Sequence, residues 1–174
     1  MALLLLGAGQ GGGGQSLRAG TEVFAVDPDL VLEVSYRTSS MRLSAQRRGP
    51  GEPFHLTFWE KNQSQPVSCP AGEGFARVLA QLTSLKLHRT LEAREAEEYF
   101  RRNPLPSWAE LVIRDVSALE PFRALLHPVA GSAPEALVHF QGVTYLVDFQ
   151  TQVFSLLAGG CRTLGVERPL RRND

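Results

Sequence analysis

Apolar and polar residues alternate along much of this chain, and this alternation constrains the fold more than any other feature of the sequence. It starts near residue 21 and is clearest in residues 31–36, 41–46 and 54–58. Alternation puts the apolar side chains of a strand on one face, so each segment is expected to be half-buried. The short connection at residues 38–40 joins the first two segments. The sequence therefore predicts a hairpin with one face exposed to water.

One later segment has a helical period instead. Its apolar residues recur three or four positions apart: Phe75, Val78, Leu79, Leu82 and Leu85. Such residues form one stripe on a helix, which predicts an amphipathic helix over residues 73–87 that covers the apolar face of the strands. Pro70 opposes any extension towards the N-terminus. Shorter helices are expected at residues 92–101 and 149–157.

Strand patterns return after Pro106. Residues 109–114 alternate, and residues 121–126 are consistent with a strand or with a single helical turn. Residues 136–140 and 143–148 form a second predicted hairpin, with its turn at Gln141-Gly142. The chain is thus expected to be α+β, with a mainly antiparallel sheet of hairpins packed against one amphipathic helix and one or two shorter helices.

The length of 174 residues is typical of one domain. Residues 1–20, apolar and then glycine-rich, are expected to be the remnant of a leader or anchor followed by a linker. Residues 21–160 are expected to form the single α+β domain. Residues 161–174 are expected to be a basic, flexible tail.

The charge balance argues against binding to nucleic acid. Eighteen basic residues face eighteen acidic ones, for a net charge of zero. Nucleic-acid binding usually needs a surplus of Lys and Arg that displaces counterions from phosphates. No nucleic-acid partner is therefore expected.

Gly7, Gly9 and Gly12 match the spacing of a dinucleotide-binding loop, and Asp27 follows where an acid would contact a ribose. That site also needs a helix that begins at the phosphate. Only eight residues separate Gly12 from Thr21, and several are glycines that disfavour a helix. We therefore expect no nucleotide and no other cofactor, and a nucleotide-dependent enzyme that uses residues 7–27 is kept as an alternative.

The residues that carry chemistry show no catalytic or metal-binding spacing. Cys69 and Cys161 could form one disulfide or remain two buried thiols. The four histidines lie far apart in sequence and lack the spacing of a zinc helix: His55, His88, His127 and His139. The sequence therefore predicts no catalytic residue and no metal ligand.

Three features occur in order along the chain: a strand that ends at Phe58-Trp59, a leucine-striped helix that leads to Arg89, and a late segment from Tyr145 to Leu157. In this order the chain resembles a bacterial envelope family known as domain of unknown function 4340. Two places differ from the family pattern, at residues 98–100 and 125–128. The resemblance implies an N-terminal membrane anchor and, in some relatives, proximity to ABC-transporter components. It implies no catalytic residue.

These observations predict a non-catalytic, membrane-associated interaction domain that serves as an accessory subunit of a membrane protein assembly. The expected location is the periplasmic or lumenal side of a membrane, with the cytoplasm left open. Candidate interaction residues are aromatic side chains that flank or face the predicted strands: Trp59, Trp108, Phe140 and Tyr145. The alternative is a small-molecule-binding or enzymatic α+β domain with an unrecognised pocket. The oligomeric state is left open.

Overall fold

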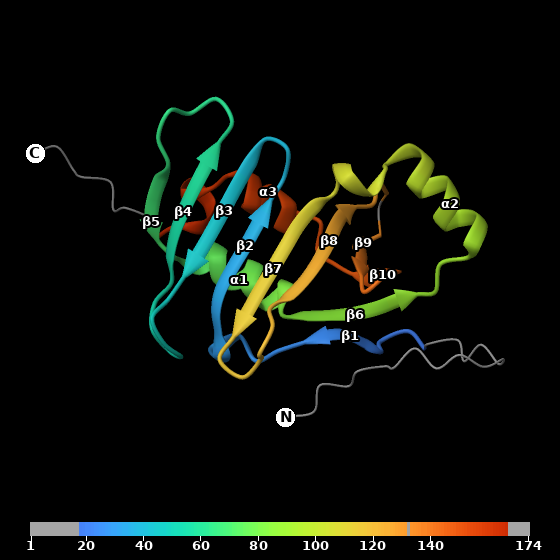
Figure 1. Ribbon diagram of the computed structural model, residues 1–174, viewed down its shortest axis with the longest axis horizontal. Coiled ribbons are helices and arrows are strands. Elements are labelled where there is room, and N and C mark those ends of the chain that lie inside the picture. The colour runs from blue at the N-terminus through green and yellow to red at the C-terminus, as the bar shows by residue number, and fades with distance from the viewer. Residues whose placement is uncertain (1–17, 132, 167–174) are drawn as a thin grey trace, which may run out of the picture.

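A computed structural model describes residues 18–131 and 133–166 of the chain (Figure 1). Within these residues one antiparallel sheet has the strand order β1-β6-β10-β9-β8-β7-β2-β3-β4-β5. Its strands are β1 (Glu22–Ala25), β2 (Val31–Arg37), β3 (Met41–Gln46), β4 (His55–Glu60), β5 (Val67–Pro70), β6 (Ser84–Arg89), β7 (Ala109–Asp115), β8 (Phe122–Pro128), β9 (Glu135–Phe140) and β10 (Val143–Asp148). The helices are α1 (Glu73–Leu82), α2 (Ala93–Arg102), α3 (Gln152–Ala158) and α4 (Cys161–Leu164), with 3-10 turns at Pro28–Leu30 and Leu105–Ser107. The predicted α+β class is confirmed.

The fold contains the same arrangement twice. Strands β2 to β5 form a meander that leads into α1, and β7 to β10 form a second meander that leads into α3. The first strands of the two meanders, β2 and β7, pair side by side in the middle of the sheet. The segment after each helix then crosses to the other half. Strand β6 pairs with β10, while Gly165 bridges to Ala71 just after β5.

Helices α1 and α3 lie side by side behind the sheet (Figure 1). Phe75, Val78, Leu79 and Leu82 of α1 are all buried in the main core, as the sequence predicts. Burial of such side chains contributes roughly 1.5–3 kcal/mol each. The same core takes up the inward residues of the strands, among them Val34, Leu43 and Leu111. A smaller core of Trp108, Val129, Leu137 and Leu146 lies on the other face of the sheet, near α2.

The predicted helix over residues 73–87 is too long. It ends at Leu82, where the hydroxyl of Thr83 donates a hydrogen bond to the Leu79 carbonyl oxygen at 2.7 Å. Residues 84–89 alternate and form β6, which lies between β1 and β10. Leu85 fits both the helical period of the preceding segment and the alternation of the strand. It is buried as a strand residue because β6 pairs with a strand on each side.

The second predicted hairpin is confirmed in both strands and in its turn. Gln141 and Gly142 both have positive φ, 50° and 78°. Positive φ at both central residues matches the right-handed twist of the flanking strands. The uncertain segment at residues 121–126 belongs to strand β8.

The prediction that residues 161–174 form a flexible tail is wrong for its first part. Residues 161–164 form α4, and the side chain of Leu164 is fully buried. The backbone N–H of Val166 donates a hydrogen bond to the Pro70 carbonyl oxygen at 3.1 Å. This segment therefore covers the end of β5, a strand that the sequence pattern did not predict.

Candidate functional site

One face of the sheet is open where β7, β2, β3 and β4 lie next to one another. Helices α1 and α3 cover the back of these strands, and no helix of the described residues crosses their front (Figure 1). The outward side chains form rows across the strands because paired residues face the same side. The outer row consists of Trp59, Arg42, Arg37 and Glu110.

Two further rows run parallel to the outer row. The middle row has short side chains across four strands and continues into Val112: Ser68, Thr57, Ser44 and Ser35. The third row is polar and contains His55, Gln46, Glu33 and Arg114. The open face thus has long side chains on both sides of a row of hydroxyl-bearing ones. We call these three rows the open sheet face.

Ion pairs connect most of the charges on the open sheet face. Arg37 and Glu110 are 2.5 Å apart, and Arg123 of β8 reaches the same carboxylate at 4.0 Å. Arg114 lies 3.7 Å from Glu33. All three arginine side chains are more than half exposed, so each pair adds little to stability.

Arg42 differs from these arginines. Its guanidinium lies over the ring of Trp59, 5.3 Å from the centroid, in a cation–π contact. No carboxylate of the described residues lies within 4 Å of it. Arg42 also stands directly opposite Arg37 on β2, and like charges in such a pair repel. The outer row therefore holds a positive charge that has no carboxylate partner in the part of the chain that the structure describes.

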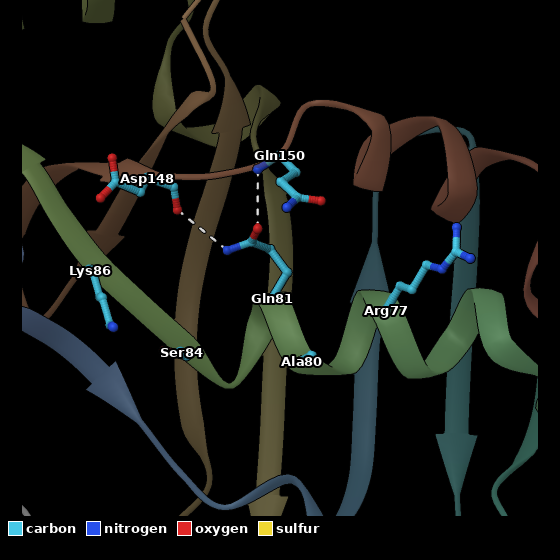
Figure 2. Close-up of a pocket in the computed structure, with 7 residues that line it drawn as sticks. All are labelled: Arg77, Ala80, Gln81, Ser84, Lys86, Asp148 and Gln150. Atoms are coloured by element: carbon cyan, nitrogen blue, oxygen red, sulfur yellow. Dashed lines mark hydrogen bonds between the residues drawn. The ribbon is translucent and has the colours of Figure 1, made fainter.

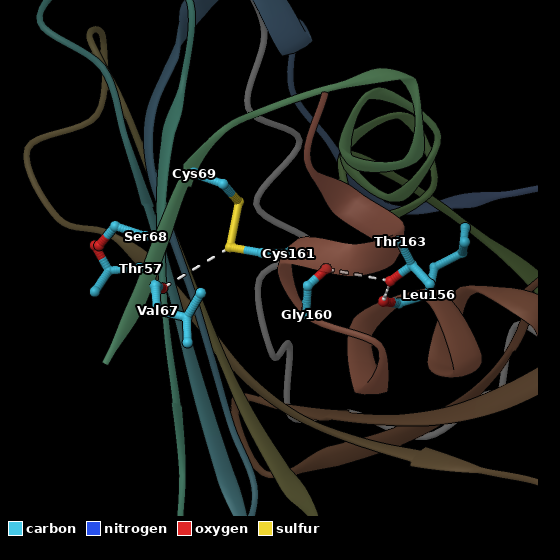
Figure 3. The surroundings of a disulfide bond; sticks show 8 residues. All are labelled: Thr57, Val67, Ser68, Cys69, Leu156, Gly160, Cys161 and Thr163. Carbon is cyan, nitrogen blue, oxygen red and sulfur yellow. Dashed lines mark hydrogen bonds between the residues drawn. A yellow bond between two sulfur atoms is a disulfide. The ribbon is translucent and has the colours of Figure 1, made fainter. Parts of the chain in front are cut away.

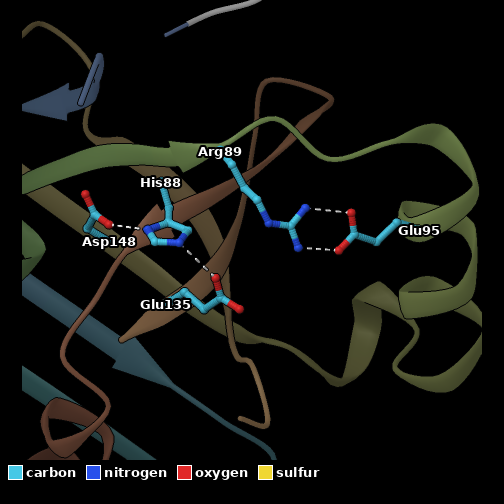
Figure 4. A network of polar contacts seen from close by, with 5 residues as sticks. All are labelled: His88, Arg89, Glu95, Glu135 and Asp148. Carbon is cyan, nitrogen blue, oxygen red and sulfur yellow. Dashed lines mark hydrogen bonds and ion pairs between the residues drawn. The ribbon is translucent and has the colours of Figure 1, made fainter. Parts of the chain in front are cut away.

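Two sets of polar contacts involve the neighbouring residues His88 and Arg89 of β6 (Figure 4). His88 of β6 lies between two carboxylates: its Nδ1 is 2.5 Å from Asp148 and its Nε2 is 3.5 Å from Glu135. The Nδ1 contact is a hydrogen bond, whereas Nε2 lies beyond ordinary hydrogen-bond distance of Glu135. His88 thus connects β6 to Glu135 of β9 and Asp148 of β10.

Arg89, the next residue of β6, holds α2 through a bidentate pair with Glu95, at 2.7 and 2.5 Å (Figure 4). The hydrogen bond from Arg89 holds the pKa of Glu95 below its ordinary value of 4.5, and the carboxylate in turn raises the pKa of Arg89. The contact joins α2 to the sheet.

An open depression of about 400 Å³ lies between α1, β6 and the end of β10. Gln81 closes one side of it by donating to the Asp148 carbonyl oxygen and accepting from the Gln150 N–H (Figure 2). The charged ends of Arg77 and Lys86 lie at opposite ends of the view and point away from each other (Figure 2). A second depression, of about 280 Å³, lies near Met41 and Ala158. The charged ends of Arg77 and Lys86 at the larger depression do not converge as the polar groups of a ligand site do.

Cys69 of β5 and Cys161 of α4 form a disulfide (Figure 3). Their Cα atoms are 5.9 Å apart, although the residues are 92 positions apart in sequence. The bond fastens α4 to the edge strand of the first meander. It resolves the choice that the sequence left open in favour of the bridge, and such bridges are typical of oxidising compartments.

The four predicted interaction residues lie in different places. Trp59 is half-buried and belongs to the open sheet face. Trp108 is only 4% exposed, and its indole N–H donates to the Asn103 carbonyl oxygen at 2.8 Å, so it is a core residue of the small cluster. Phe140 and Tyr145 are half-buried and pack against the main core. Among the four, only Trp59 belongs to the open sheet face.

Residues that the sequence pattern did not single out dominate the open face. Arg42, Arg37 and Glu110 come together only through the pairing of β3, β2 and β7. The alternation does mark them as outward residues, but it cannot give the register between strands far apart in sequence. Sequence reasoning therefore named Trp59 as a candidate and named none of the arginines beside it.

The other residues that the sequence analysis weighed for chemistry make ordinary structural contacts. His139 lies 2.8 Å from the Thr144 hydroxyl, and His127 stacks on Trp108. Within the described ranges no three His, Cys, Asp or Glu side chains are arranged to hold a metal ion. The carboxylate of Asp27 accepts a hydrogen bond from the Asp29 N–H. The glycine motif of residues 7–12 lies outside the described residues.

No known protein family, curated protein or solved structure matched this chain on comparison. The resemblance to the envelope family therefore stays a prediction. No helix among the residues described is both long and apolar enough to cross a bilayer.

Proposed function

We propose that this chain is a non-catalytic interaction domain and an accessory subunit of a membrane protein assembly, located on the periplasmic or lumenal side. The observation that carries the proposal is the open sheet face, with Arg42 over Trp59 at its corner. An exposed, ordered sheet face with an aromatic and several arginines has the residue types that are enriched at protein interfaces.

Two features of the charged groups support binding over catalysis. Asp148 engages Nδ1 of His88, and Glu135 lies 3.5 Å from its Nε2, so this imidazole is held among the protein's own carboxylates. The larger depression is open, and its two cationic ends do not converge. General acid–base catalysis needs a positioned group within hydrogen-bond reach of its substrate.

The disulfide supports the proposed location. Cytosolic thiols are usually kept reduced, whereas a structural bridge persists in the periplasm, in the lumen of the endoplasmic reticulum or outside the cell. The Cys69–Cys161 bridge joins the edge strand β5 to α4, so its position is that of a structural disulfide.

Site-specific photocrosslinking in the source cells tests this function. A photoreactive amino acid replaces Ser44, in the middle row of the open face, in a tagged full-length chain. The same amino acid replaces Ala76, which is exposed on α1 on the other side of the sheet, as the control. We expect position 44 to give a discrete crosslink to a membrane-assembly protein and position 76 to give none. No crosslink from position 44, or equal crosslinks from both positions, would contradict the proposal.

The alternative, a small-molecule-binding or enzymatic domain, would use the depression beside Gln81. Its volume of about 400 Å³ is within the range of ligand pockets. The change Gln81→Ala removes the two hydrogen bonds that the Gln81 side chain makes, one to the Asp148 carbonyl oxygen and one from the Gln150 N–H. Without this side chain the depression should be wider. If cell extract metabolites raise the melting temperature of the wild-type chain but not of this variant, the alternative replaces the interaction domain.

A further inference from the structure

We propose that the open sheet face binds an acidic segment of its partner protein, with Arg42 and Arg37 as the residues that receive its carboxylates. This inference rests on the proposed function and adds the chemistry of the partner. The chain as a whole has a net charge of zero, but its positive and negative charges are unevenly distributed over the surface. The inference starts from this uneven distribution.

Arginine outnumbers the acidic residues on this face. The rows and the adjoining β8 strand carry four arginines and two glutamates: Arg37, Arg42, Arg114, Arg123, Glu33 and Glu110. Both glutamates are already engaged by arginines of the same face. A surplus of positive charge therefore remains, and complementary negative charge on a partner would neutralise it.

The surplus is greatest at the outer row. Arg42 and Arg37 stand directly opposite each other, and Glu110 pairs with Arg37, while among the described residues Arg42 contacts the Trp59 ring and no carboxylate within 4 Å. A guanidinium offers five N–H donors in a planar fork that fits a carboxylate. A carboxylate placed over this corner would relieve the repulsion between the two arginines and bond to Arg42.

Trp59 adds an apolar contact beside this charge. Its ring is half-buried and already holds the Arg42 guanidinium in place, which lowers the entropy that Arg42 loses when it binds a carboxylate. The short serine and threonine side chains of the middle row leave the backbone of the partner room to approach. Together these features favour an extended acidic polypeptide over a small anion, which would contact the corner alone.

The test uses the full-length chain and a short synthetic peptide that alternates glutamate and valine, with binding measured by calorimetry at low salt. A peptide that alternates lysine and valine is the probe control. We expect the glutamate peptide to bind and the lysine peptide not to bind. The change Arg42→Glu should weaken binding about tenfold or more, as for a charge pair in a partly desolvated contact.

Arg77→Glu is the matched variant, because it makes the same charge change on α1, where the side chain is 70% exposed. It should leave the affinity for the glutamate peptide within about twofold of wild type. Trp59→Leu keeps all the arginines and should weaken binding less than Arg42→Glu. Melting curves identify any variant that fails to fold, and Arg42→Gln then replaces Arg42→Glu.

Three results would overturn the inference: no binding of the glutamate peptide, equal loss in Arg42→Glu and Arg77→Glu, or binding of anionic phospholipid vesicles without peptide binding. The last result would assign the face to a membrane surface. A crosslink from position 44 without peptide binding would leave the interaction domain intact and reject only the acidic partner. Peptide binding without that crosslink would support the charge argument and reject the proposed cellular role.

Discussion

The indole of Trp108 and the imidazole of His127 stack with their centroids 5.2 Å apart and their planes 20° from parallel. Trp108 belongs to the small core near α2, and His127 is half-buried beside it on β8. This placement explains why the pKa of His127 is lowered from its ordinary value of 6.5, since burial penalises the charged imidazolium. The pair links the protonation of one side chain to the packing of the whole cluster.

Protonation of His127 should therefore be visible in the fluorescence of Trp108. In a Trp59→Phe variant, which leaves Trp108 as the only tryptophan, emission should fall as the pH falls, with a midpoint below pH 6.5. Neutral His127 is favoured in the folded state, so its contribution to stability is complete above pH 6.5 and decreases as the pH falls below it. The additional change His127→Gln should abolish the titration. A midpoint at or above 6.5 would show that burial does not control this group.

Removal of the disulfide should lower stability substantially. The variant Cys69→Ser, Cys161→Ser opens a loop of 92 positions, and the chain-entropy model assigns such a loop about 4–5 kcal/mol. Urea denaturation with and without a reductant measures the loss in the wild-type chain. The double variant should match the reduced wild type and should not respond to the reductant. A midpoint that stays the same after complete reduction would mean that α4 is held by its packing alone.

The sequence predicts local pairing well because the necessary signals lie close together. Residues 135–148 alternate on both sides of Gln141-Gly142, whose backbone suits the turn. The pairing register of the two strands, and the face on which each side chain lies, follow directly from this pattern. Leu85 shows the limit of this argument. Its position fits the helical stripe and the strand alternation equally, and only the hydrogen bonds from β1 and β10, which lie on both sides, decide for the strand.

Features that depend on distant segments could not be predicted. Strand β5 has four residues, one of them Pro70, and it exists because β4 and the segment after α4 flank it. The open sheet face depends on the pairing of β2 with β7, which brings Arg37 to Glu110 across 73 positions. The sequence marks these residues as outward-facing, but it contains no local signal for which of them become neighbours.

The Arg89–Glu95 pair should contribute a small, pH-dependent part of the attachment of α2. The change Glu95→Gln should lower the stability of α2 by about 1 kcal/mol or less, because both side chains are partly exposed. The lowered pKa of Glu95 means that this contribution is present above pH 4.5 and is lost as the pH falls through the folded-state value. Hydrogen exchange of the α2 amides measures it. Glu97→Gln, on the exposed side of α2, should have no such effect.

Gly74 should tolerate no larger residue, although it lies inside a helix where alanine is normally preferred. Alanine in place of glycine stabilises an exposed helix by about 1 kcal/mol. Here a Cβ at position 74 would overlap the Thr163 carbonyl oxygen, because α4 packs directly against α1 at this point. Gly74→Ala should therefore lower the melting temperature and weaken the docking of α4, measured as faster reduction of the Cys69–Cys161 bridge.

Gly49→Ala is the control for this last change, since a Cβ at position 49 would have no heavy atom within 4 Å. Its effect on stability should stay within about 0.5 kcal/mol. If Gly74→Ala raises the melting temperature and leaves the rate of reduction unchanged, then α4 can move away from α1 without cost. The close approach of the two helices would then contribute nothing to the position of the disulfide, which would hold α4 through its covalent bond alone.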